Sequence, residues 1–256
     1  MRNPWALAGL VALLSCSATA QASNDGWKIA FSDPGAGDWQ DLWFVEGLKA
    51  NVEYDEGSLV FTAGPVPGEQ ESHAVLWSRQ SFKGDIRIEY DYTRLDSMTE
   101  APSVNILYVQ ATGLGTDESP TDIFLSTNQR EVPWMKSYFL NMSTLHISYA
   151  TTGPKRSHYV AARRYPAAHQ KNFMHSTMVQ PVYENVDLFK PGETYHITVQ
   201  KEGKRLSFRA EREGKTHSFE WDTSAFPPVT EGRIGLRHMW ARSSRYENFR
   251  VFEKQD

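Results

Sequence analysis

The sequence predicts an all-β protein, a two-sheet antiparallel β-sandwich, and three observations lead to this fold class. Apolar and polar residues alternate over many short segments, as in strands with one buried face. Aromatic residues make up 12% of the chain, and glycines and prolines punctuate it. No long apolar stripe of helical period occurs. Many short strands in one chain are typical of two packed sheets.

The expected strands follow one another along a single domain. The alternating segments are 58–63, 85–95, 105–111, 194–221 and 232–239. Segment 194–221 is expected to be a three-stranded meander, because Gly203 and Gly214 each lie in a turn signal between runs of β-forming residues. Two regions are expected to be long loops, 113–132 and 154–181. Loops of this length in a compact domain are often functional.

The N-terminal segment has the features of an export signal. One arginine precedes an apolar run from Trp5 to Leu14, and small residues follow. We therefore expect a signal peptide at 1–22 and a single domain at 23–256. Alternatively, Cys16 is the acylated residue of a lipoprotein. No later segment is long enough for a transmembrane helix, so a secreted or periplasmic location is predicted.

The charge distribution is uneven. The formal net charge is -4, yet positions 132 to 183 contain no Asp or Glu, and segment 153–166 reads GPKRSHYVAARRYP. A cationic region in an acidic, exported protein favours an anionic partner, here an acidic polysaccharide or oligosaccharide. Nucleic acid is not expected, since no nucleic-acid-binding motif is found. The alternative is a solvated loop face.

Several motifs carry a family resemblance. They are GRIGLRHMWARSSRYENFRVFE (232–253), FKGDIRIEYDYTRLD (82–96), NILYVQATG (105–113) and HISYATTG (146–153). Together they resemble the bacterial YesU-like family, whose members are linked to polysaccharide utilisation and have no assigned function. The resemblance implies a concanavalin-A-like jelly roll with a sheet that holds a carbohydrate chain. Several polysaccharide lyases share that architecture.

Cleavage of a uronate polymer by β-elimination sets the chemical requirements. The C6 carboxylate must be neutralised, a base must remove the C5 proton, and an acid must protonate the departing oxygen. We predict His146 as base or carboxylate-neutralising group, Tyr159 as acid, and Arg163 as carboxylate ligand. Tyr159 and Arg163 share a strand face, because side chains two apart point the same way. The alternatives are an ordinary paired strand histidine for His146, aromatic packing for Tyr159 and a solvated loop face for Arg163.

Further polar, cationic and aromatic residues are predicted to contact substrate. Asn105, Tyr108 and Gln110 interrupt an apolar strand, and His238, Trp240 and Arg242 share a face if their strand continues. The complete set of predicted substrate-binding residues is Asn105, Tyr108, Gln110, His158, Arg164, His175, Arg237, His238, Trp240 and Arg242. His175 is also a second candidate base.

Two rival functions remain open. Glu89 and Asp91 resemble part of the acidic strand of jelly-roll glucanases, but Arg94 stands where the last Glu is required, which weakens a glycoside hydrolase. The other rival is a non-catalytic carbohydrate-binding protein. No metal site and no catalytic cofactor are expected, although a structural calcium is compatible with Asp33 and Glu247.

Overall fold

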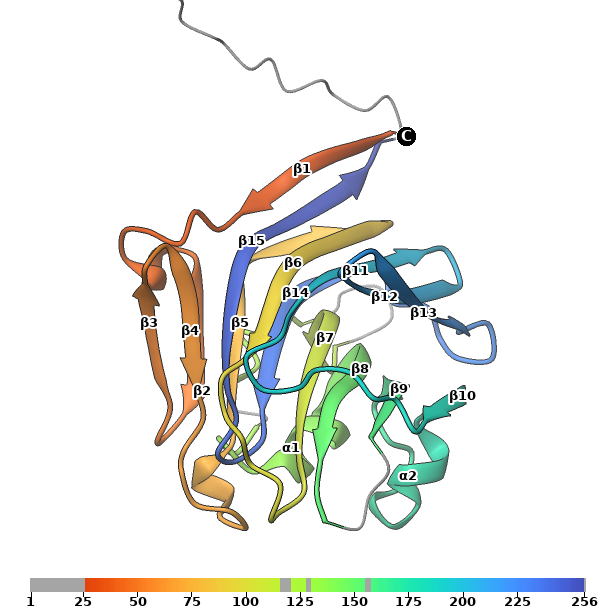
Figure 1. The fold of residues 1–256 in the computed structure, drawn as a ribbon. Helices are drawn as coiled ribbons and strands as arrows, with labels where there is room; N and C mark the ends of the chain where they lie inside the picture. The colour runs from red at the N-terminus through yellow and green to blue at the C-terminus, as the bar shows by residue number, and fades with distance from the viewer. Residues whose placement is uncertain (1–25, 116–120, 128–129, 155–157, 256) are drawn as a thin grey trace, which may run out of the picture.

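The computed structural model describes residues 26–115, 121–127, 130–154 and 158–255 and contains two antiparallel sheets facing each other (Figure 1). One sheet has eight strands in the order β13-β12-β11-β6-β15-β4-β3, with β1 paired to β15. The other has seven, in the order β10-β9-β8-β7-β14-β5-β2. This arrangement confirms the predicted antiparallel β-sandwich.

The bounds of the elements are as follows. The eight-stranded sheet contains β1 (Trp27–Ser32), β3 (Asn51–Asp55), β4 (Ser58–Thr62), β6 (Ile86–Arg94), β11 (Thr194–Glu202), β12 (Arg205–Arg212), β13 (Lys215–Asp222) and β15 (Ser243–Lys254). The seven-stranded sheet contains β2 (Trp43–Gly47), β5 (Ala74–Lys83), β7 (Ser103–Gly113), β8 (Met142–Thr152), β9 (Tyr159–Tyr165), β10 (Met178–Glu184) and β14 (Glu231–His238). The helical elements are η1 (Trp39–Asp41), η2 (Gln70–Ser72), α1 (Met135–Asn141), η4 (Gln170–Asn172) and α2 (Phe173–Ser176).

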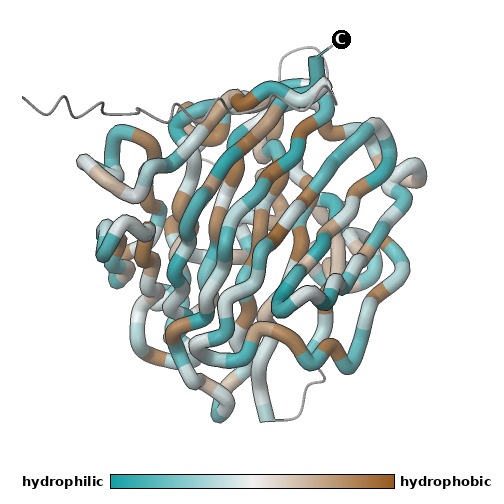
Figure 2. Tube along the Cα trace, turned by 45° about the horizontal axis from the view of Figure 1, so that its top comes forward, coloured by the Kyte–Doolittle hydropathy of each residue, from teal (hydrophilic) through white to brown (hydrophobic). Residues whose placement is uncertain are grey.

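The main core lies between the sheets. Hydrophobic and hydrophilic residues alternate along the strands (Figure 2), and the apolar sides of both sheets face inward. Ile88 and Tyr90 of β6 and Leu107 of β7 are fully buried there. The predicted meander is confirmed as β11, β12 and β13. Its turn glycines, Gly203 and Gly214, adopt positive φ angles of 55° and 74°, which a side chain would strain.

The outer face of the seven-stranded sheet carries a second apolar cluster, which includes Trp77, Tyr108 and Tyr138. Helix α1 packs on this face. A buried carboxylate fixes it there: Glu46 accepts hydrogen bonds from the Tyr138 hydroxyl at 2.6 Å and from Arg130 Nη2 at 2.6 Å. A paired and hydrogen-bonded charge is the usual form of a buried carboxylate.

The prediction of a long loop at 154–181 is wrong in part. It contains all of β9, the short helix α2 and the start of β10. The positive charges of this region obscure an alternating pattern in which Val160 and Ala162 point into the core. Two arginines of β9 are almost buried as well, with exposed fractions of 6% for Arg163 and 5% for Arg164. Burial of cations on a strand is uncommon, so the sequence favoured a loop.

No helix within the described part of the chain is long and apolar enough to cross a membrane. The predicted signal peptide, with Cys16, lies outside the described residues.

Candidate functional site

A cleft of about 210 Å³ opens on the outer face of the seven-stranded sheet. Its polar lining includes His146 and Ser148 from β8, Tyr159 and Arg163 from β9, and Arg237 from β14. The three predicted catalytic residues therefore lie together, and so do two of the predicted binding residues, Tyr108 and Arg237. We name this feature the Arg163 cleft.

Strand pairing explains why these residues meet. His146 pairs directly with Arg163 across β8 and β9, and with Tyr108 across β8 and β7. Arg237 pairs with Ile106, which pairs with Ser148. Three strand spacings of about 4.8 Å separate the β9 and β14 backbones by roughly 14 Å. Two long guanidinium side chains therefore approach the same patch from its two sides.

His146 is buried and uses both ring nitrogens. Its Nδ1 lies 2.9 Å from the Tyr165 hydroxyl, and its Nε2 lies 2.7 Å from the Ser148 hydroxyl. Loss of solvent, together with the charges of Arg163 and Arg237, holds the pKa of His146 well below its usual value. The imidazole is therefore neutral. A neutral ring can accept either a hydrogen bond or a proton, and both of its predicted roles require this neutral form.

Within the described part of the chain, Arg163 contacts neutral groups only. Its Nη1 donates to the carbonyl oxygen of Met174 and to the hydroxyl of Thr177, both at 3.1 Å. Its guanidinium lies 5.0 Å from the centre of the Phe173 ring. Burial lowers the pKa of Arg163. No carboxylate among the described residues pairs with this cation.

Arg237 also has only a neutral hydrogen-bond partner among the described residues. Its Nη2 donates to His73 Nδ1 at 2.9 Å, and its Nε is buried with no partner within the described ranges. Burial and the charge of Arg237 lower the pKa of His73 to about 2, so His73 is a neutral acceptor. The Trp240 ring packs against His73 at 4.7 Å and limits its orientation.

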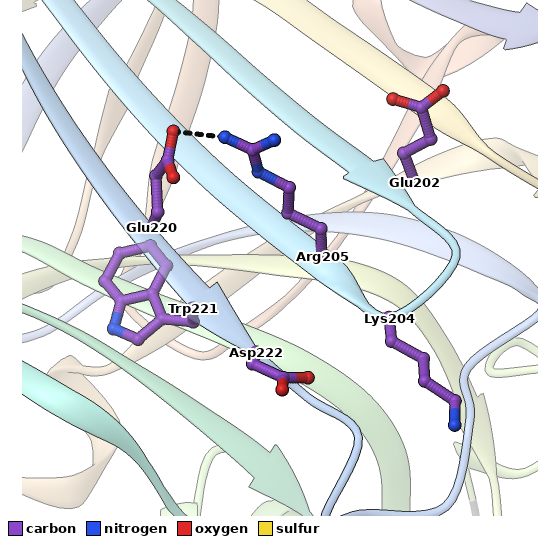
Figure 3. Close-up of a pocket in the computed structure, with 6 residues that line it drawn as sticks. All are labelled: Glu202, Lys204, Arg205, Glu220, Trp221 and Asp222. Atoms are coloured by element: carbon purple, nitrogen blue, oxygen red, sulfur yellow. Dashed lines mark hydrogen bonds and ion pairs between the residues drawn. The ribbon is translucent and has the colours of Figure 1, made fainter.

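Two other arginines of the sandwich, Arg205 and Arg242, each have a carboxylate partner. Figure 3 shows a surface hollow on the eight-stranded sheet, where Arg205 points at Glu220 and pairs with it at 2.6 Å. Both partners there are more than half exposed. Arg242, although fully buried, pairs with Asp96 at 3.0 Å. Arg163, Arg164 and Arg237 are thus nearly buried guanidinium groups without a carboxylate partner in the described structure, and of these three only Arg163 and Arg237 line the Arg163 cleft.

Four predicted binding residues point away from the cleft. Asn105 donates to the Tyr246 hydroxyl at 3.3 Å, and His238 Nε2 lies 2.8 Å from the same hydroxyl, between the sheets. Gln110 donates to backbone carbonyls, and Arg242 donates to the Ala150 carbonyl at 2.8 Å. Successive side chains of a strand point to opposite faces, so Asn105 and His238 point between the sheets while the adjacent Ile106 and Arg237 point to the cleft. The strand ends at His238, so the expected shared face with Trp240 and Arg242 does not form.

The remaining predicted residues are also outside the cleft lining. Arg164 faces the opposite side of β9 and donates to the Pro227 carbonyl at 3.0 Å, and burial lowers its pKa to about 10. Trp240 donates to the Pro102 carbonyl at 2.7 Å. His158 and His175 are exposed.

Sequence reasoning missed three contributors. Ser148 and Tyr165 hold both nitrogens of His146, and His73 holds Arg237. Period-two spacing from His146 and Arg163 could have identified the first two. Nothing in the sequence links His73 to Arg237, because they meet through pairing of β14 with β5.

Comparison with known proteins identifies the family. Residues 35–251 match the model of a family described as a domain of unknown function, DUF1961. The chain belongs to the DUF1961 family. No curated protein matches it significantly.

Solved structures similar to this DUF1961 protein share its fold. A Bacillus subtilis protein of unknown function with a galectin-like fold has a TM-score of 0.63 and 20% identity, covering 88% of this chain and 97% of its own. The lectin UEA-II complexed with galactose has a TM-score of 0.54, 12% identity and coverages of 90% and 98%. The VIP36 exoplasmic/lumenal domain, bound to Ca2+ and Man3GlcNAc, has a TM-score of 0.53, 11% identity and coverages of 90% and 89%. The concanavalin-A-like jelly roll predicted for the chain is thereby confirmed.

The acidic residues considered for hydrolysis lie on the other sheet of the DUF1961 domain. Glu89 is 2.9 Å from Arg87, and Asp91 accepts from His196 at 2.8 Å and from Asn248 at 2.6 Å. No Asp or Glu lines the Arg163 cleft in the part of the chain that the structure describes. The glucanase-like arrangement of an acid and a nucleophile is therefore absent from the described cleft.

The carboxylate of Asp33, considered for calcium, is engaged with protein donors. It accepts from Trp43 Nε1 at 2.7 Å, from the Tyr54 hydroxyl at 2.8 Å and from the Gly35 amide at 2.8 Å. Within the described ranges, no group of three or more His, Cys, Asp and Glu side chains could hold a metal ion. Asp33 is therefore a hydrogen-bond acceptor for three protein groups.

Proposed function

We propose that the Arg163 cleft binds the anionic group of an acidic polysaccharide or oligosaccharide. One observation carries this proposal: Arg163 and Arg237 are only 6% and 7% exposed, and their described contacts are with neutral groups. Burial of a charge without an opposite charge is costly. A carboxylate or sulfate that enters the cleft supplies the missing counter-charge and accepts hydrogen bonds from guanidinium groups.

The fold supports a carbohydrate rather than another anion. Structures of similar fold are described as bound to galactose and to Man3GlcNAc. This support is by analogy, because one fold hosts many functions. The predicted export signal and the YesU-like resemblance, with its link to polysaccharide utilisation, agree with an extracytoplasmic glycan and with a secreted or periplasmic protein.

We further propose β-elimination as the reaction, because the Tyr159 phenol is half-buried in the same cleft as the two guanidinium groups. Neutralisation of the uronate carboxylate acidifies the C5 proton. Loss of this proton and rupture of the C4–oxygen bond create a C4–C5 double bond, and the departing oxygen gains a proton. Tyr159 is the proposed proton donor. The neutral ring of His146 is the proposed acceptor of the C5 proton, through the Ser148 hydroxyl that lies 2.7 Å from its Nε2.

Two measurements on the same samples test both levels of the proposal. Calorimetric titration with oligomers of galacturonate, glucuronate and mannuronate, and with sulfated oligosaccharides, reports binding. Absorbance in the unsaturated-uronate band reports cleavage. Arg163→Gln is expected to weaken binding of an anionic oligomer at least tenfold, whereas Arg205→Gln on the other sheet leaves binding unchanged.

The outcomes separate the candidate functions. Binding with growth of the absorbance band identifies a lyase, and binding without any product identifies a non-catalytic binding protein. New reducing ends without the absorbance band would indicate a hydrolase. Equal affinity for anionic and neutral oligomers would refute the role assigned to the two arginines.

A further inference from the structure

The Arg163 cleft also has an apolar part to its lining. Besides the polar groups, its lining contains six apolar residues: Val104, Ile106, Met135, Phe139, Phe173 and Met174. Phe139 and Phe173 stack at 4.1 Å, and Met174 remains 56% exposed at the rim. We name these six residues the apolar wall. Because Phe173 also lies against the Arg163 guanidinium, a ligand that reaches this cation lies along the wall.

The hydrogen-bonding groups of the cleft are few and selective. The polar lining consists of two guanidinium groups, one imidazole, and the hydroxyls of Ser148 and three tyrosines. Asp, Glu, Asn and Gln, whose oxygens accept hydrogen bonds from sugar hydroxyls, are missing from the described lining. A fully hydroxylated sugar would place hydroxyls against the apolar wall without partners, which is costly in a buried site.

The size of the cleft limits the ligand. Its volume of about 210 Å³ is below the roughly 300 to 1,000 Å³ of sites for drug-sized ligands. One sugar residue therefore occupies the cleft, and the rest of a chain lies outside it.

From these features we propose, on the basis of the anion binding proposed above and independently of the cleavage step, that the cleft selects one acidic sugar residue bearing an apolar substituent. The anionic group lies at Arg163 and Arg237, and the substituent lies against the apolar wall. The shared chemistry is an anion with a nearby methyl group, and it has two sources. One is a methyl-etherified uronate, and the other is a sulfated 6-deoxyhexose.

Matched ligand pairs test this selection in the full-length protein. The first pair is 4-O-methyl-D-glucuronate and D-glucuronate. The second is a sulfated 6-deoxy-D-galactose and the D-galactose sulfated at the same position. In at least one of the two pairs, the sugar with the extra methyl group or the 6-deoxy carbon is expected to bind at least about fourfold more tightly than its partner. This ratio corresponds to the burial of one methylene-sized group. Calorimetric or competition titration measures each ratio.

A substitution in the wall provides the second measurement. Val104→Thr retains side-chain shape but adds a hydroxyl to the wall, so the affinity ratio of the favoured pair is expected to fall towards one. Val52→Thr on β3, the edge strand of the other sheet, is the matched control and keeps the wild-type ratio.

Each outcome bears on a distinct claim. Ratios below about two in both pairs, with anionic sugars still bound, would overturn the selection for an apolar substituent and leave the proposed glycan binding intact. A ratio that survives in Val104→Thr would also overturn the assignment to this wall. If no charged sugar binds better than its uncharged analogue, the proposed function and this inference both fail.

Discussion

Removal of the buried carboxylate that anchors α1 is expected to destabilise the protein strongly. Glu46 is 5% exposed and accepts hydrogen bonds from Arg130, Tyr138 and Trp77. The Arg130 side chain is fully buried. Glu46→Gln keeps the shape but leaves this cation without its counter-charge. Loss of one partner of a buried ion pair costs about 3 to 5 kcal/mol.

The loss is measurable in two ways. At about 2 to 4 °C per kcal/mol for a chain of this size, the midpoint of thermal unfolding falls by roughly 6 to 20 °C. Urea titration followed by tryptophan fluorescence gives the free energy of unfolding directly. Because α1 contributes Met135 and Phe139 to the cleft, ligand affinity is expected to fall as well.

Matched variants test the reasoning. Glu220→Gln breaks the exposed pair with Arg205 and is expected to cost less than about 1 kcal/mol. The double variant Glu46→Gln/Arg130→Met removes both buried charges and is expected to recover much of the lost stability. A cost below about 1 kcal/mol for Glu46→Gln alone would refute the claim that the ion pair anchors α1.

Three further outcomes are expected. Burial lowers the pKa values of His73, His146 and His238 in the folded state, so below about pH 6.5 the unfolded chain binds more protons than the folded one. Each of these histidines is therefore expected to lower the free energy of unfolding by about 1.4 kcal/mol for every pH unit below that value. Urea titrations that give equal free energies of unfolding at about pH 7 and pH 5 would contradict this. Tyr159→Phe is expected to abolish growth of the unsaturated-uronate band while calorimetry still detects binding, and full turnover would exclude the phenol as proton donor. Gly235→Ala places a methyl group 2.3 Å from the indole ring of Trp77 on β5 and is expected to lower the free energy of unfolding by about 1 to 3 kcal/mol. An unchanged midpoint of thermal unfolding would contradict this close packing.

A local rule accounts for the shared strand face of Tyr159 and Arg163. A period of two predicts Tyr159 and Arg163 on one face of a strand, and the structure places both side chains in the cleft. The same rule failed for Trp240 and Arg242, because the chain leaves β14 at His238. A strand end is set by tertiary contacts as much as by residue preference.

The charge pattern identified a region but not its geometry. The sequence predicted cationic side chains near residues 153–166, yet it did not distinguish exposed cations from buried ones. Arg164 and Arg163 are neighbours in sequence, and strand pairing places one against backbone carbonyls of 227–228 and the other in the cleft. Their different environments arise from elements distant in the chain.

The alternation of apolar and polar residues, by itself, determined the antiparallel sandwich, because a strand with one apolar side must bury that side against another sheet. Only the tertiary structure decided that β8, β9 and β14 bring His146, Arg163 and Arg237 to one cleft. Strand order and register are long-range properties, set by the packing of the whole core rather than by any short segment.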